Sequence, residues 1–276
     1  MLQEPFTDLR WAYQLHYYIC FRTRWRREAF GEAERETAIT RLLAEVCHNH
    51  GYHLLQHKIY PDHVRCLLSL KPDQSISVVI NKLKSNISRE FCSEFGREPP
   101  LWATGYLARS IGRVRVQAVK QYLAHQAEHH GYDARTRSPV YRYGSDQPAP
   151  LRAAHSVFNL SYHLVFSTPY RRGVFGSTLG GELVGYWLKV ARKRGFALDQ
   201  ATVLPDHVHI LVRLAPKTSI HDCAVSLMNN SQHWMAKHHK KALMHAEVDS
   251  VWKPSAYAGT CGKVTTAMVK AFLGSG

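Results

Sequence analysis

The sequence has no uninterrupted apolar run of the length that a membrane-spanning helix needs, and its N-terminus has no signal-peptide pattern. These two absences favour a soluble, cytoplasmic protein without a membrane partner. The six cysteines are scattered along the chain and include no Cys-x-x-Cys pair. We therefore expect reduced thiols, most of them buried in the interior.

Acidic residues are scarce relative to basic ones. The chain of 276 residues contains 36 lysines and arginines but only 21 aspartates and glutamates, which gives a formal net charge of +15 and a pI near 9.7. An excess of this size suits a polyanionic partner, and without an amphipathic membrane anchor it favours nucleic acid over lipid. A charge that only keeps the protein soluble is the alternative.

One short motif occurs twice. The segment 204–212 reads LPDHVHILV, and the segment 60–68 reads YPDHVRCLL. Each is a Pro-Asp turn that leads directly into an apolar strand. Because strand residues two apart point to the same face, His207 and His209 present two imidazoles side by side, an arrangement suited to a divalent metal. In the first segment His63 is followed by Arg65, a permanent cation that cannot ligate a metal.

The remaining predicted elements also pair off between two halves. Glycines at 51 and 195 end the first helix of each half, and Ser75 and Ser219 can cap the second. The paired predictions are strands at 10–23 and 157–168, helices at 32–49 and 178–194, strands at 52–59 and 196–203, helices at 76–95 and 220–240, short strands that open at 101 and 251, and final helices within 112–123 and 262–273. Such pairing indicates a tandem duplication.

The order strand-helix-strand-strand-helix-strand predicts an α+β protein with two ferredoxin-like, split βαβ domains, whose antiparallel sheets are flanked by helices. The first predicted domain spans 1–130 and the second spans 154–276. Residues 131–153 are rich in Arg, Ser, Pro and Gly and are predicted to form a linker.

The ordered motifs resemble those of the HUH single-tyrosine transposases of single-strand insertion sequences and their REP-associated relatives. Residues 162–172, YHLVFSTPYRR, look like the first strand and loop of that family. Residues 205–209, PDHVH, resemble its metal motif. Residues 105–106 together with 122–126, YLAHQ, resemble its nucleophile helix. The resemblance extends over nearly the whole chain, twice.

The resemblance implies that Tyr122 attacks a phosphodiester of hairpin-containing single-stranded DNA, which leaves a 5′-phosphotyrosine and a free 3′-OH. A tyrosine with a pKa near ~10 is a poor nucleophile at neutral pH, so a metal that polarises the phosphate makes chemical sense. Mg²⁺ or Mn²⁺ suits a site with His207 and His209. By resemblance Gln126, about one helical turn beyond Tyr122, is the third ligand.

Neither half matches the family motifs alone. The first half has Tyr122 and Gln126 but a degenerate His63 and Arg65, whereas the second has His207 and His209 but Phe272 in place of tyrosine. In homodimeric relatives the tyrosine helix of one subunit can complete the site of the other. The resemblance therefore implies a monomeric intramolecular pseudo-dimer with one hybrid active site and one inactive site.

Basic and aromatic residues near these motifs are candidates for nucleic-acid contacts, although a solvated surface is the ordinary alternative. They are Arg22, Arg24, Trp25, Arg26, Arg27, Lys82, Lys84, Arg89, Tyr170, Arg171 and Arg172. Three functions are compatible with the sequence: a nicking and joining transposase, a catalytically silent, domesticated binder of DNA hairpins, and an RNA-binding protein. The complementary retention of the histidine pair and Tyr122 favours the transposase.

Overall fold

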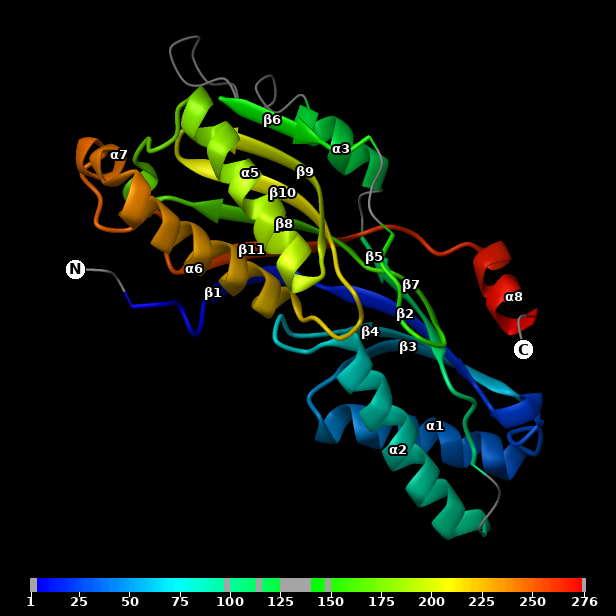
Figure 1. The fold of residues 1–276 in the computed structure, drawn as a ribbon. Coiled ribbons are helices and arrows are strands. Elements are labelled where there is room, and N and C mark those ends of the chain that lie inside the picture. The colour runs from blue at the N-terminus through cyan, green and yellow to red at the C-terminus, as the bar shows by residue number, and fades with distance from the viewer. Residues whose placement is uncertain (1–3, 97–99, 113–115, 125–139, 147–149, 275–276) are drawn as a thin grey trace.

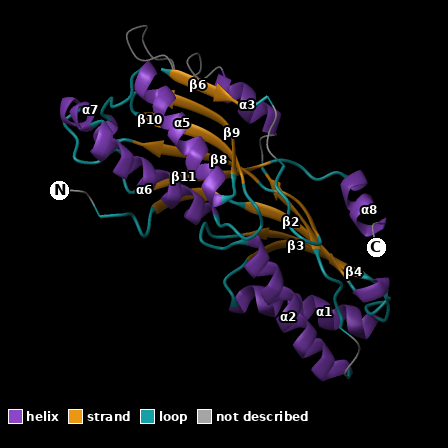
Figure 2. Cartoon of the chain, in the orientation of Figure 1, coloured by secondary structure: helices purple, strands orange, loops and turns teal. Residues whose placement is uncertain are grey.

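The computed structural model describes residues 4–96, 100–112, 116–124, 140–146 and 150–274. They form a mixed α and β structure with two sheets and flanking helices (Figure 1). The helix pair α1 and α2 lies at one end of the molecule, and the pair α5 and α6 lies towards the other (Figure 2).

The five-stranded sheet is built mainly from the first half of the chain. Its strands, in spatial order, are β3 (His53–Tyr60), β4 (His63–Ser69), β2 (His16–Arg22), β5 (Tyr106–Ile111) and β7 (Ser156–Asn159). The apolar residues of α1 (Ala33–Asn49) and α2 (Ile76–Phe95) pack on one face, against alternate residues of β2 and β4 such as Ile19 and Val64. The opposite face receives α8 (Thr266–Gly274), whose Val269 and Phe272 contact Cys20 and Leu107.

The six-stranded sheet is built mainly from the second half. Its strands, in order, are β1 (Arg10–Gln14), β11 (Ser255–Cys261), β8 (Ser161–Ser167), β10 (His207–Arg213), β9 (Ala197–Leu204) and β6 (Tyr141–Gly144). One face packs on α5 (Ser177–Arg194) and α6 (Ile220–His238), which is followed by α7 (Lys240–His245). The other face receives α3 (Val116–Ala124). Short 3₁₀ turns, η1 (Arg24–Arg26) and η2 (Pro169–Arg171), follow β2 and β8.

The two halves exchange strands. Strand β1 pairs in parallel with β11 of the second half, and β7 pairs in parallel with β5 of the first half. Only Leu15 separates β1 from β2, and only Leu160 separates β7 from β8, so each extended segment begins in one sheet and continues into the other. The prediction of purely antiparallel sheets is therefore corrected, because each exchanged strand runs in the same direction as its new neighbour.

Reciprocal hydrogen bonds join the sheets where the strands cross. The hydroxyl of Ser110 donates to the carbonyl oxygen of Cys261 at 2.6 Å, and that of Thr260 donates to the carbonyl oxygen of Ile111 at 2.6 Å. Gly112 and Gly262 follow these strands, and a Cβ at either would collide with backbone oxygen of the opposite strand. The crossing therefore requires glycine on both sides.

Other predicted boundaries also change. The segment 141–144 within the predicted linker is strand β6, which pairs antiparallel with β9. The short strands predicted to open at 101 and 251 begin instead at Tyr106 and Ser255, and Trp102 and Trp252 are core side chains. Ser219 caps α6 by accepting a hydrogen bond from the N–H of Asp222, whereas Ser75 occupies the cap position of α2 without a side-chain bond.

The cysteine prediction is confirmed. All six thiols are free, five are buried and Cys92 is partly buried. Within the described ranges, no helix is long and apolar enough to cross a membrane.

Candidate active site

The helix that contains Tyr122 packs on the sheet of the other half. Val116 and Val119 of α3 contact Leu211 of β10 and Cys261 of β11. The side chain of Gln200 donates to the carbonyl oxygen of Lys120 at 3.1 Å. Leu211, His209 and His207 are spaced two residues apart along β10, so their side chains point to the same face of the sheet. Because α3 contacts Leu211, it covers the face that bears the histidine pair. The structure describes the backbone of Tyr122 but not its side chain, and Gln126 lies outside the described residues.

The two histidines of β10 each contact a neighbouring side chain through the same ring atom, Nδ1. Both are buried, and their ring centroids are 5.0 Å apart. Nδ1 of His207 lies 2.7 Å from Oδ1 of Asp206, and Nδ1 of His209 lies 3.0 Å from Nε2 of His163. Because Asp206 and His163 contact the Nδ1 atoms of these rings, Nε2 is the atom through which each ring would ligate a metal. This donor set fits a divalent cation.

His163 is the residue of this site that the sequence motifs did not bring out. Its ring stacks on His209 with a centroid separation of 5.2 Å, and burial lowers the pKa of His163 to about 4. Tyr257 of β11 also lies nearby, with its ring 5.8 Å from that of His163. His163 lies within the segment 162–172 that resembles the family, but only strand alternation indicates its neighbours, since His163, His209 and Tyr257 occupy equivalent faces of three adjacent strands.

The first half has the same framework with a cation added. Nδ1 of the buried His63 lies 2.6 Å from Oδ1 of Asp62, as in the second half. Here, however, Nε2 of His63 accepts a hydrogen bond from Nε of Arg65 at 3.1 Å. The Arg65 guanidinium also lies 4.3 Å from the ring centroid of Tyr60. Burial, only partly offset by the hydrogen bond to Asp62, lowers the pKa of His63. Nε2 of His63 cannot ligate a metal while its lone pair accepts this hydrogen bond from the guanidinium.

Phe272 lies over this first-half site. It is buried against Cys20 and Leu107, and the guanidinium of Arg22 is 5.4 Å from its ring centroid. Arg22 donates to the carbonyl oxygen of Phe272 at 3.3 Å, and Arg26 donates to that of Leu273 at 3.0 Å. These bonds satisfy carbonyl groups at the C-terminal end of α8. The final helix of each half therefore packs on the sheet of the other half (Figure 1).

Two equivalent loops beside the sites expose an aromatic ring. Trp25 and Arg26 have φ values of 56° and 55°, and Tyr170 and Arg171 have values of 53° and 58°. Non-glycine residues seldom adopt this conformation, and its repetition at matching positions points to a specific requirement. An ion pair fixes each loop, from Arg26 to Asp62 at 2.8 Å and from Arg171 to Asp206 at 2.9 Å.

The loops leave Trp25 and Tyr170 at 68% and 90% exposure. The guanidinium of Arg24 lies 4.4 Å from the centroid of Trp25. Arg22, Arg24, Trp25 and Arg26 share a cavity of about 790 Å³ with Trp102. A basic cavity beside an exposed aromatic ring has the chemistry of a nucleotide-binding surface.

The other predicted basic contacts differ in their surroundings. Lys84 donates to the carbonyl oxygens of Ala103 and Gly105 at 2.6 and 3.2 Å, and burial lowers its pKa to about 8. Arg172 pairs with Glu247, and Arg27 donates to the carbonyl oxygen of Pro100. Lys82 is exposed on α2.

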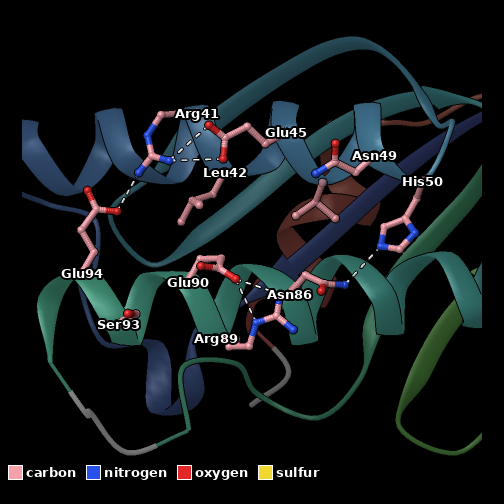
Figure 3. A pocket seen from close by; sticks show the side chains of 11 residues that line it. Arg41, Leu42, Glu45, Asn49, His50, Asn86, Arg89, Glu90, Ser93 and Glu94 are labelled. Atoms are coloured by element: carbon pink, nitrogen blue, oxygen red, sulfur yellow. Dashed lines mark hydrogen bonds and ion pairs between the residues drawn. The ribbon is translucent and has the colours of Figure 1, made fainter.

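Arg89 lines a separate groove between α1 and α2, shown in Figure 3. This groove has a volume of about 340 Å³, and its charged residues pair with one another. Arg41 contacts Glu94 at 2.6 Å and Glu45 at 3.2 Å, and Arg89 contacts Glu90 at 2.8 Å. Because its positive charges are neutralised locally, this groove is a poor surface for a polyanion.

The family model for IS200-like transposases matches residues 11–126 and again residues 156–275. The chain belongs to this family. The match confirms the resemblance that the sequence motifs indicated, and it supports an enzyme of DNA transposition. Tyr122 lies in the first matched segment, and His207 and His209 lie in the second.

Individual relatives align with less than half of this chain. The ISDra2 transposase TnpA of Deinococcus radiodurans is 26% identical over 119 residues, which cover 43% of this chain and 85% of the relative. The transposase for insertion sequence element IS200 of Salmonella typhimurium is 24% identical over 120 residues, which cover 44% of this chain and 78% of the relative.

Two solved structures are also similar. One is a transposase structure from Deinococcus radiodurans, with 23% identity, a TM-score of 0.35 and coverage of 42% of this chain and 92% of that chain. The other is a REP-associated tyrosine transposase bound to a REP hairpin, with 16% identity, a TM-score of 0.28 and coverage of 46% and 68%.

Proposed function

We propose that this protein is a single-strand DNA transposase that nicks and joins hairpin-containing DNA at one hybrid active site. The single observation that carries the proposal is the packing of α3 on the face of the six-stranded sheet that bears His207 and His209. A nucleophile must come within about 3–3.5 Å of its target, so ligands and tyrosine must meet in space. The packing of α3 on the sheet of the other half supports the approach of Tyr122 to the histidine pair.

The architecture belongs to the same proposal. We interpret the two halves as ferredoxin-like HUH domains in tandem, which act as an intramolecular pseudo-dimer. Support comes from the repeated element order, the two family matches and the reciprocal exchange of β1 with β7 and of α3 with α8. A single chain would then contain both partners that a homodimer supplies, and it would work as a monomer.

The metal in this proposal is Mg²⁺ or Mn²⁺. His207 and His209 would hold it through Nε2, and Gln126 would be a further ligand. Within the described residues no group of three His, Cys, Asp or Glu side chains is suited to a metal, so the remaining positions would fall to Gln126, water and DNA. When bound, the ion would polarise the scissile phosphate.

The residues of the chain account for the rest of the reaction. The phenolic oxygen of Tyr122 forms a bond to phosphorus as it loses its proton, and the bond from phosphorus to the 3′ oxygen breaks. The 3′ oxygen takes up a proton, which leaves a 3′-OH and a 5′-phosphotyrosine. Asp206 keeps the Nδ1 proton of His207 in place and so orients its ring. Trp25 and Tyr170 would stack on unpaired bases.

The decisive experiment is the trapping of a covalent adduct. The full chain is incubated with a labelled single-stranded hairpin oligonucleotide and Mn²⁺, and the products are separated on a denaturing gel. We expect an adduct whose peptide map places the DNA on Tyr122. Tyr122→Phe should abolish it, whereas the matched variant Tyr257→Phe, which changes a tyrosine whose ring lies 5.8 Å from that of His163, should retain it. An adduct on any residue but Tyr122 contradicts the hybrid site.

A catalytically silent hairpin-binding protein is the second candidate. The observation that favours it is the occupation of the first-half site by Arg65 and Phe272. This candidate predicts hairpin binding without any adduct in the same experiment. The retained pair His207 and His209 makes it the less favoured function.

A further inference from the structure

His163 contacts His209, one of the proposed metal ligands, through its ring nitrogen Nε2. Its Nε2 atom lies 3.0 Å from Nδ1 of His209, which is hydrogen-bonding distance. The side chain projects from β8, the strand next to β10, and it lies on the same face of the sheet as the histidine pair. It therefore contacts His209 at Nδ1, as Asp206 contacts His207 at Nδ1.

The hydrogen bond restricts where the His209 proton resides. A neutral imidazole has one protonated and one unprotonated nitrogen, and only the unprotonated nitrogen can ligate a metal. If Nδ1 of His209 donates to Nε2 of His163, then Nε2 of His209 has a lone pair for the ion. If the donation ran in the opposite direction, Nε2 of His209 would bear the proton and could not bind.

We infer that His163 is a positioning residue of the metal site, because it accepts the Nδ1 proton of His209 and so fixes the ring in the tautomer that binds through Nε2. The inference rests on the proposed function, since it assumes that His207 and His209 hold the metal. Partners of this kind behind metal-binding histidines commonly change metal affinity when they are replaced.

The first half supplies the contrast. In the register of the strands, His163 pairs with Leu211, and Tyr18 pairs with the equivalent Leu67. Tyr18 therefore occupies the place of His163 beside Arg65, where no second metal-binding histidine needs orienting. The imidazole is found in the half that has the histidine pair, as expected of a residue that serves the metal rather than the fold.

The test measures Mn²⁺ binding to the full chain by electron paramagnetic resonance of the free ion. His163→Leu removes the acceptor and should weaken binding roughly ten- to a hundredfold. His163→Gln places a side-chain oxygen near the former Nε2 position and should remain within about threefold of the parent protein. Tyr18→Leu is the matched control and should leave Mn²⁺ affinity unchanged. Thermal melting followed by circular dichroism confirms that each variant is folded.

The outcomes separate this inference from the proposed function. If His207→Ala loses Mn²⁺ while His163→Leu binds like the parent, His163 has no positioning role and the metal site stands. An equal loss in His163→Gln and His163→Leu would indicate packing instead of proton acceptance, and it would also overturn the inference. If the parent shows no specific Mn²⁺ binding, or if His207→Ala binds Mn²⁺ as tightly as the parent, the proposed metal site is wrong and the inference falls with it.

Discussion

Nε of Arg65 donates a hydrogen bond to Nε2 of His63 at 3.1 Å, and Nε2 is the atom through which the matching His207 would ligate a metal. On the Nδ1 side, the two histidines have the same partners. Each Nδ1 contacts the preceding aspartate, and each aspartate also pairs with a loop arginine. The first-half site therefore shares the aspartate and loop-arginine framework of the second-half site.

The first prediction separates the two histidine sites. His207→Ala should reduce cleavage to background, as should EDTA, because the metal would lose a ligand or be removed. His63→Ala should leave cleavage largely intact, since Nε2 of His63 already accepts a hydrogen bond from Arg65. Adduct yield on a denaturing gel and hairpin affinity by gel shift provide the measurements. Equal damage from both substitutions would contradict a single active site.

A second prediction concerns repair of the inactive site. In a Tyr122→Phe background, the double substitution Arg65→His and Phe272→Tyr should restore a weak adduct, mapped to position 272. The framework of Asp62 and His63 is already present. The yield should stay well below that of the parent, because Gly276 follows position 272 by four residues, where the matching residue after Tyr122 is the expected ligand Gln126. The single substitution Phe272→Tyr, which leaves Arg65 in place, is the control and should give no adduct.

The third prediction addresses DNA binding. Raising salt from about 50 to 200 mM should weaken hairpin binding by roughly a thousandfold or more if at least six phosphates are contacted. Trp25→Ala and Tyr170→Ala should each cost about 1–3 kcal/mol of binding free energy if a base stacks on the ring. Tyr13→Ala removes an exposed tyrosine outside both loops and should have no effect. Salt-independent affinity would argue against a phosphate-dominated interface.

The fourth prediction follows from burial of His163. Its pKa falls from 6.5 to about 4 because burial disfavours the imidazolium, so between these pH values the unfolded chain binds a proton that the folded chain does not. The stability contributed by neutral His163 is thus complete above pH 6.5 and is lost as the pH falls towards 4. The loss should amount to about 3 kcal/mol.

Urea denaturation in EDTA at several pH values measures this dependence. His163→Gln, which has no ionisable group, should flatten the decline in unfolding free energy between pH 6.5 and 4. An unchanged slope in this variant would mean that other groups dominate the acid sensitivity.

Local patterns in the sequence were sufficient for most helices and strands and for the contrast between His209 and Arg65. The helix over residues 76–95 was predicted with its observed bounds, since apolar periodicity and turn residues act over short distances. The inward turn of Lys84 towards two carbonyl oxygens could not be predicted, because its partners lie in a loop whose path depends on the tertiary fold.

Strand partners were not predictable for the same reason. Residues 10–22 have the alternation of one long strand. Their pattern does not indicate that the first part pairs with β11 and the remainder with β4 and β5. Strand β6 was not predicted, because the composition around it is that of a linker. The role of His163 depends on a distance to His209, and a sequence contains no distances.

The exchange of β1 with β11 also has a consequence for synthesis on the ribosome. Strand β1 is translated before its partner at residues 255–261, which emerges only after the whole segment between them has been made. During that interval the nascent chain has an open strand edge, and such an edge can join a strand from another molecule. The pairing of this edge therefore depends on how quickly translation delivers β11, and slow codons between the two strands would prolong the exposure.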